Sequence, residues 1–102
     1  MPLPRALPLR TAEPSDAAAI RALTRRAYQP WVARLGREPL PMGADYDLAV
    51  RDHRFDLLER DGRLVALIET ELRPDSLYVV NVAVDPDLQG QRLGLALLAH
   101  AE

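Results

Sequence analysis

The Asp61-Gly62 dipeptide constrains the fold of this chain more than any other feature of its sequence. A two-residue type I′ turn needs positive φ at both central positions, and Asp-Gly adopts them readily. Hydrophobic runs flank the dipeptide on both sides. We therefore predict antiparallel strands at residues 55–60 and 63–72. The simplest register pairs Leu58 with Val65, Leu57 with Ala66 and Phe55 with Ile68.

The segment Leu77–Val84 is apolar at every position except Asn81, so both of its faces are apolar. Such a strand is expected in the middle of a sheet, with other elements covering each face. A turn at residues 73–76 leads into it, and Asp85-Pro86 ends it. A helix is predicted from near Arg92 to the end of the chain.

The N-terminal half is predicted to be mainly helical. A short strand is expected at residues 7–12, and then apolar residues recur at helical spacing over residues 16–28. Pro30 is expected to end this helix. Residues 31–35 fit a short helical turn, residues 39–42 a loop and residues 46–52 a further short helix. The order of elements gives an α+β fold in one domain.

Composition excludes several classes of function. The 102 residues carry a net charge of −2, and all 13 cationic residues are arginine, so lysine chemistry is excluded. The absence of cysteine excludes disulfides and thiolate sites. The scattered arginines and the acidic balance argue against a nucleic-acid partner. No apolar run is long enough to span a membrane, and we expect a cytoplasmic protein.

The junction between the apolar strand and the following helix carries the clearest chemical signal. A strand that passes through a short turn into a helix presents backbone amides and a positive helix end, which suit a phosphate. Gly90 and Gly94 allow a close approach there. They form neither G-x-G-x-x-G nor a lysine-containing phosphate loop. A turn with two packing glycines is the alternative interpretation.

Residues 81–86 and 89–98 together resemble motif A of the GNAT superfamily of acetyl-CoA-dependent N-acyltransferases. Gln89 matches the first position of the family pattern Q/R-x-x-G-x-G/A and Gly94 the last, whereas Arg92 replaces a glycine. The resemblance implies a mixed, mostly antiparallel sheet flanked by helices. Residues 1–102 would then be the portion of one such domain through motif A, without its C-terminal strands and helix.

The resemblance also implies where acetyl-CoA binds. Backbone groups of the apolar strand would bond the pantetheine arm, and the following turn and helix start would hold the pyrophosphate. Arg92 would either disturb that fit or reach a phosphate itself. No metal is expected, because His53 and His100 are the only histidines. The implied cofactor-binding residues are Val82, Ala83, Val84, Gln89, Gly90, Gln91, Arg92, Leu93, Gly94, Leu95 and Ala96.

An acceptor amine must lose a proton before it attacks the acetyl group. Glu69 and Glu71 alternate onto one face of their strand and are candidate bases, although solvated carboxylates are the alternative. Asn81 is a candidate for orienting water or substrate, or a satisfied interior amide. Tyr78 occupies the position of the carboxylate that some family members use. Candidate acceptor-binding residues, equally able to serve as core, are Tyr28, Trp31, Met42 and Tyr46.

The predicted function is therefore transfer of an acetyl group from acetyl-CoA to a primary amine of a small molecule or peptide, by direct attack. The alternatives are an inactive acyl-CoA-binding or interaction module, and a fragment completed by a partner chain. A sheet that stops at residues 77–84 has an open apolar edge. A second copy pairing there by strand exchange would make a homodimer.

Overall fold

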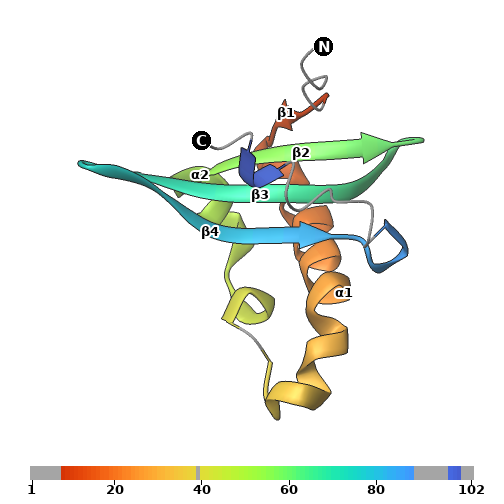
Figure 1. Ribbon diagram of the computed structural model, residues 1–102. Coiled ribbons are helices and arrows are strands. Elements are labelled where there is room, and N and C mark those ends of the chain that lie inside the picture. The colour runs from red at the N-terminus through yellow and green to blue at the C-terminus, as the bar shows by residue number, and fades with distance from the viewer. Residues whose placement is uncertain (1–7, 39, 89–96, 100–102) are drawn as a thin grey trace, which may run out of the picture.

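The structure is a computed structural model that describes residues 8–38, 40–88 and 97–99. It contains one antiparallel sheet with the strand order β1-β2-β3-β4 (Figure 1). The strands are β1 Arg10–Thr11, β2 Arg54–Arg60, β3 Arg63–Arg73 and β4 Ser76–Val84. The helices are α1 Ala17–Leu35 and α2 Tyr46–Asp52, with 3-10 turns at Pro14–Asp16, Leu40–Gly43 and Pro86–Leu88. The α+β prediction is confirmed.

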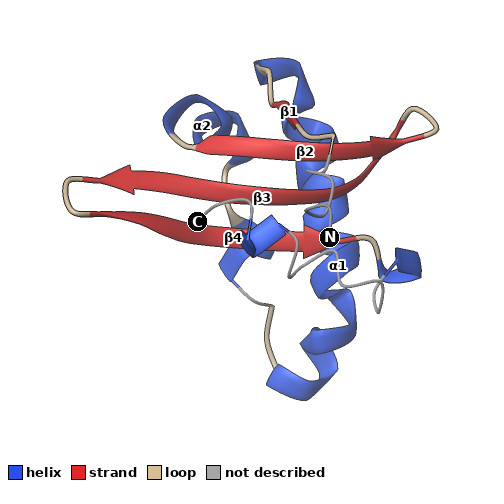
Figure 2. Ribbon diagram, turned by 45° about the horizontal axis from the view of Figure 1, so that its top comes forward, coloured by secondary structure: helices blue, strands red, loops and turns tan. Residues whose placement is uncertain are grey.

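Both faces of the sheet are covered, and each has its own core. Helices α1 and α2 lie on one face, and the helical residues 97–99 lie on the other (Figure 2). Ile20 and Leu23 of α1 pack with Phe55 and Leu67 of the sheet on the first face. Leu97 packs on the second face. Its buried partners there are Leu58, Val65, Ala66 and Ile68.

The predicted hairpin is confirmed, but its register is one residue off along most of its length. Pairs run as expected from Arg60 with Arg63 to Glu59 with Leu64. A β-bulge then leaves Val65 without a partner in the ladder, so Leu58 pairs with Ala66. A bulge opposes two residues on one strand to one residue on the other. The expected pairs of Leu58 with Val65, Leu57 with Ala66 and Phe55 with Ile68 are therefore wrong.

The turn itself has the geometry that the sequence predicts, with φ of 55° at Asp61 and 75° at Gly62. We expect Gly62→Ala to lower the free energy of unfolding by about 1 kcal/mol, because a Cβ disfavours positive φ. Gly43→Ala is the matched control, since Gly43 has no positive φ and no atom within 4 Å of an added Cβ. Urea denaturation of both variants measures the difference, and equal midpoints would contradict the assignment of the turn.

Helix α1 is longer than predicted and continues through Pro30. A proline in a helix removes one backbone hydrogen bond but keeps a helical φ, so it weakens a helix without always ending it. Gly36 ends α1 instead, with φ of 70° and an N–H donated to the carbonyl of Val32. The separate turn expected at residues 31–35 is thus the last part of one helix.

The remaining boundaries agree with prediction in part. Helix α2 has the expected bounds, and the Asp45 carboxylate caps it by accepting from the N–H groups of Asp47 and Leu48. The expected loop at 39–42 is mostly the 3-10 turn Leu40–Gly43. The strand expected at 7–12 is only two residues long.

Strand β4 does not lie in the middle of the sheet in the described part of the chain. Only β3 pairs with it there, so β4 is at the edge. Its first residues are exposed, including Leu77, Tyr78 and Val79. Its last residues run under both cores, where Ala83 packs on one face and Val82 and Val84 on the other. Strand β4 is apolar on both faces along most of its length, but only its second half is buried on both faces.

Candidate functional site

A pocket of about 520 Å³ lies between α2 and the face of β3 and β4 that the helices cover. Its volume falls within the range of about 300–1,000 Å³ that is common for ligand sites. Its lining is mostly apolar, with carboxylates and one imidazole. The lining residues are Pro41, Ala44, Asp45, Tyr46, Leu48, Ala49, Asp52, His53, Glu69, Tyr78 and Val80.

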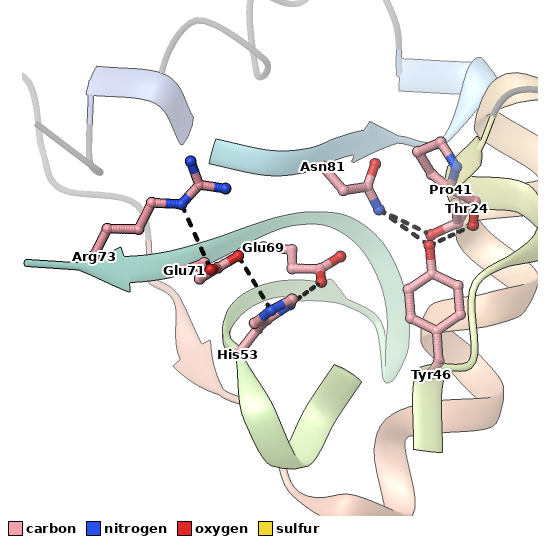
Figure 3. A network of polar contacts seen from close by, with 8 residues as sticks. All are labelled: Thr24, Pro41, Tyr46, His53, Glu69, Glu71, Arg73 and Asn81. Carbon is pink, nitrogen blue, oxygen red and sulfur yellow. Dashed lines mark hydrogen bonds and ion pairs between the residues drawn. The ribbon is translucent and has the colours of Figure 1, made fainter. Parts of the chain in front are cut away.

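The His53 side chain joins two carboxylates at this pocket, those of Glu69 and Glu71. Oε2 of Glu69 lies 2.7 Å from Nδ1 of His53, and Nε2 of His53 lies 3.5 Å from Oε2 of Glu71 (Figure 3). Arg73 approaches Glu71 from its other side, at 3.5 Å. An ionised carboxylate only accepts hydrogen bonds, so Nδ1 of His53 donates to Glu69 when Glu69 is charged.

Burial sets the proton affinity of Glu69, which is only 4% exposed. Desolvation raises the pKa of this carboxyl above its ordinary value. The hydrogen bond and charge of His53 act in the opposite direction, and the charge of Glu71 adds to the rise. A carboxylate with a raised pKa accepts a proton more readily near neutral pH, as a general base must.

Local structure explains why His53 joins the two glutamates. His53 ends α2 and comes directly before β2. The observed register pairs Arg54 with Thr70, which places His53 beside Glu71 and diagonal to Glu69. The register predicted without the bulge would have placed His53 opposite Thr70, on the wrong face. His53 was therefore missed as a site residue, although Glu69 and Glu71 share one face as predicted.

Asn81 belongs to a second polar network, on the same face of the sheet. Its Oδ1 accepts from the hydroxyl of Tyr28 at 2.8 Å. Its Nδ2 lies 3.4 Å from both Thr24 Oγ1 and the Tyr46 hydroxyl (Figure 3). The Tyr46 hydroxyl donates to the carbonyl of Pro41 at 2.6 Å. This arrangement matches a satisfied interior amide that ties α1 to β4.

The four residues predicted to bind the acceptor are brought together only in part, since Tyr28 and Tyr46 both contact Asn81. Tyr46 lines the pocket. Tyr28 contacts Asn81 and the carbonyl of Val82, and Met42 is buried with 2% of its surface exposed. Trp31 lies toward the end of α1, exposed, with the guanidinium of Arg34 5.2 Å from its ring. Of the four, only Tyr46 is positioned to contact a molecule in the pocket.

Strand β4 is bulged where it borders the pocket. Glu69 pairs with Asn81 and Thr70 with Val79, so Val80 has no partner in the ladder. Beyond the bulge, the N–H of Asp85 donates to the carbonyl of Val65. Backbone groups alternate in direction along an antiparallel strand, so those of Ala83 face β3 while those of Val82 and Val84 face the other edge. Of the three predicted strand residues, Val82 already accepts a hydrogen bond at its carbonyl from the Tyr28 hydroxyl, at 3.2 Å.

The rest of the predicted cofactor-binding segment, residues 89–96, lies outside the described residues. Asp85 directly follows β4. The carboxylate of Asp85 is buried and lies 2.8 Å from Arg63 and 3.3 Å from Arg26. It also accepts the N–H of Asp87, which is the main reason that its pKa lies below the ordinary value. Asp85 thereby holds the end of β4 against α1 and the β2–β3 hairpin.

We expect Asp85→Asn to lower the free energy of unfolding by about 1–3 kcal/mol at pH 7, because it removes charge-assisted hydrogen bonds. The folded-state pKa of Asp85 is depressed, so this stabilisation is present above the unfolded-state pKa and is lost as the pH falls through the folded-state value. The difference from the wild type should therefore shrink in acid. Denaturation at several pH values measures it.

Asp87→Asn is the control for this prediction. Asp87 is exposed and donates to Asp85 only through its backbone N–H, which the substitution keeps. Its free energy of unfolding should change by less than about 0.5 kcal/mol. A loss at Asp85 that is equally large at pH 3 and pH 7 would contradict the role given to its charge.

Two further classes of site were searched for among the described residues. No group of three or more His, Asp or Glu side chains in residues 8–38, 40–88 and 97–99 has the geometry to hold a metal ion. No helix in these ranges is long and apolar enough to cross a membrane. The candidate functional sites in the described part of the chain are the pocket beside Glu69 and the edge of β4.

The four-stranded antiparallel sheet with helices on both faces matches the fold of acyl-CoA N-acyltransferases. The chain belongs to the Acetyltransferase (GNAT) family, which matches residues 17–102. This confirms the resemblance seen in motif A. A segment of 43 residues is 44% identical to the ribosomal protein bS18-alanine N-acetyltransferase of Escherichia coli K12, covering 42% of this chain and 29% of that protein.

Solved structures of acetyltransferases share the fold. The E. coli ribosomal-protein-S18-alanine N-acetyltransferase has a TM-score of 0.61 at 24% identity, covering 90% of this chain and 54% of that one. The PaiA N-acetyltransferase of Thermoplasma acidophilum, in complex with coenzyme A, has a TM-score of 0.68 at 15% identity, and the match covers 91% of this chain and 67% of that one. A GNAT acetyltransferase of Brucella melitensis, in complex with acetyl-CoA, has a TM-score of 0.63 at 19% identity, covering 90% and 63%. The chain thus spans about half the length of the E. coli enzyme.

Proposed function

We propose that this protein, acting in the cytoplasm, transfers an acetyl group from acetyl-CoA to a primary amine of a small molecule or peptide. The observation that carries the proposal is the buried carboxylate of Glu69, which has a raised pKa and opens on a pocket beside the bulged strand β4. Family membership supplies the donor, because the related structures include complexes with coenzyme A and acetyl-CoA.

Glu69 takes the proton from the acceptor amine, directly or through one water. His53 keeps the carboxylate in place through the 2.7 Å contact, and Glu71 orients the imidazole from its other nitrogen. The free amine then attacks the thioester carbonyl, so that a C–N bond forms, the C–S bond breaks, and the sulfur leaves as a thiolate that takes up a proton. The chain contributes mainly by positioning the two substrates.

The edge of β4 fits the extended arm of the donor. Strand β4, which ends at Val84, is an edge strand in the described part of the chain, and an extended ligand arm can pair with the backbone of an edge strand as an added strand would. Gln89, Gly90, Gln91, Arg92, Leu93, Gly94, Leu95 and Ala96 hold the pyrophosphate in this proposal. Asp85 holds the end of β4 through its contacts with Arg63 and Arg26.

The bS18-alanine N-acetyltransferase relative favours a peptide amine among the acceptors, since its name specifies an alanine of a ribosomal protein. A second candidate function is binding of acyl-CoA without transfer, or an interaction module completed by a partner chain at β4. The edge position of β4 in the described part of the chain favours this candidate.

Two measurements on the same sample separate these candidates. Acetyl-CoA should raise the melting temperature by mass action, and free thiol should appear when amines or N-terminal peptides are added. A thermal shift without thiol release would indicate the binding module. No shift at millimolar acetyl-CoA would contradict both acetyl transfer and acyl-CoA binding, and would leave the interaction module.

A further inference from the structure

We propose that the pocket beside Glu69 selects a primary amine on an apolar body that carries no carboxylate, in preference to a free amino acid. This inference rests on the proposed function, because it assigns the acceptor to the pocket described above. It is carried by three features of the described residues: the charge of the lining, the place of its apolar side chains, and the burial of Glu69.

The charged groups that line the pocket are negative, apart from the imidazole of His53. Asp45, Asp52 and Glu69 contribute carboxylates, and no arginine is among the described lining residues. Of these, Asp45 also caps α2 through its Oδ1. A cavity lined by one sign of charge concentrates ligands of the opposite sign and repels those of the same sign. An ammonium group is therefore attracted here, and a carboxylate finds no guanidinium in the described lining, where the His53 imidazole already contacts Glu69 and Glu71.

Two arginines that contact lining residues are already engaged with other groups. The guanidinium of Arg73 lies 3.9 Å from the centre of the Tyr78 ring and 3.5 Å from Glu71. Arg51 lies 3.7 Å from Asp52, with both side chains largely exposed. Neither arginine lines the pocket. A substrate carboxylate would have to compete with Glu71 or with solvent for either of them.

The apolar side chains lie where a substrate body would enter. Leu48 is 47% exposed and Tyr78 is 48% exposed, and both line the pocket. Glu69 is almost fully buried. The amine is therefore directed inward to Glu69, and an apolar body behind it covers Leu48 and Tyr78. Burial of such surface favours binding by about 25 cal/mol per Å².

Phenethylamine, phenylalanine and phenylalanine amide test the inference, because they share one aromatic body and one primary amine. The first lacks the carboxylate, the second carries it, and the third keeps its bulk without its charge. We expect calorimetry on the full chain to give a Kd for phenethylamine and for the amide at least tenfold lower than that for phenylalanine. Like charges in contact oppose binding strongly enough for such a ratio.

Leu48→Arg is the variant that tests the cause of this preference. Leu48 is half exposed, so the substitution should leave the fold intact, and it adds a cation to the pocket entrance. The ratio of Kd values for phenylalanine and phenethylamine should fall severalfold. Equal Kd values in the wild type, or no binding of any of the three, would overturn the inference.

The outcomes also separate this inference from the proposed function. Calorimetry without acetyl-CoA reports only the acceptor pocket. Preferential binding of the amine with no acetylated product would leave the pocket assignment standing and contradict the transfer. Acetylation of phenylalanine and phenethylamine at equal kcat/KM would support the transfer and contradict the preference.

Discussion

Glu69→Gln lowers kcat/KM for acetyl transfer by about 10²–10⁴-fold, the usual contribution of a general base. Glutamine keeps the shape of the side chain and can still accept from His53, but it cannot take a proton from the amine. Release of free thiol at saturating acetyl-CoA measures the rate. In the wild type the rate should rise with pH through the raised pKa of Glu69, and this rise should disappear in the variant.

The fold should survive this substitution. For a carboxyl with a raised folded-state pKa, the stabilising contribution is present below the unfolded-state pKa and is lost as the pH rises through the folded-state value. Glutamine does not titrate, so the variant escapes this loss at pH 7. Glu71→Gln is the comparison on the same strand face: Glu71 reaches Glu69 through His53, so this variant should lower kcat/KM less than Glu69→Gln does. Full activity of Glu69→Gln would show that another group takes the proton.

Leu67→Ala lowers the free energy of unfolding by about 2–5 kcal/mol, because a fully buried leucine is replaced by a cavity. Leu67 lies at the centre of β3 with no exposed surface and packs into the core beneath α1. Urea denaturation, followed by circular dichroism, measures the change.

Leu72→Ala is the control, since it makes the same substitution on the same strand at a residue that is 84% exposed. Its free energy of unfolding should change by less than about 0.5 kcal/mol. Similar losses for the two variants would mean that β3 does not form the described core.

The hairpin shows how far local sequence carries a fold prediction. Asp61-Gly62 predicts the turn correctly, since the backbone angles it needs are a property of two residues. The bulge at Val65 depends on packing against both faces of the sheet, which no local pattern reveals. The predicted register is one residue off, so it places His53 on the face of the sheet opposite to Glu69 and Glu71. The contact of His53 with these two residues therefore did not follow from it.

The helical half shows a similar limit. Pro30 predicts a helix end from its own chemistry, yet α1 continues to Leu35. The residues that favour the longer helix follow the proline, and Gly36 supplies the αL conformation that ends it. Propensity at one position is a weak guide when several turns on each side are helical.

The candidate site was predicted in part for an equally physical reason. Alternation along a strand puts Glu69 and Glu71 on one face whatever the register, so that prediction needed no tertiary knowledge. Contacts between residues from different elements, such as Asn81 with Tyr28 or Asp85 with Arg26, depend on how α1 lies across the sheet. The roles assigned to residues 82–84 and 89–96 in binding acetyl-CoA stay predictions.

Mass spectrometry of phenethylamine incubated with acetyl-CoA and the full chain tests whether the protein transfers an acetyl group at the pocket beside Glu69. We expect N-acetylated amine and free coenzyme A in equal amounts, formed by the wild type and almost absent with Glu69→Gln. Free thiol without acetylated amine would indicate hydrolysis of the donor. That result, or product formed equally by both proteins, would contradict transfer at the pocket beside Glu69.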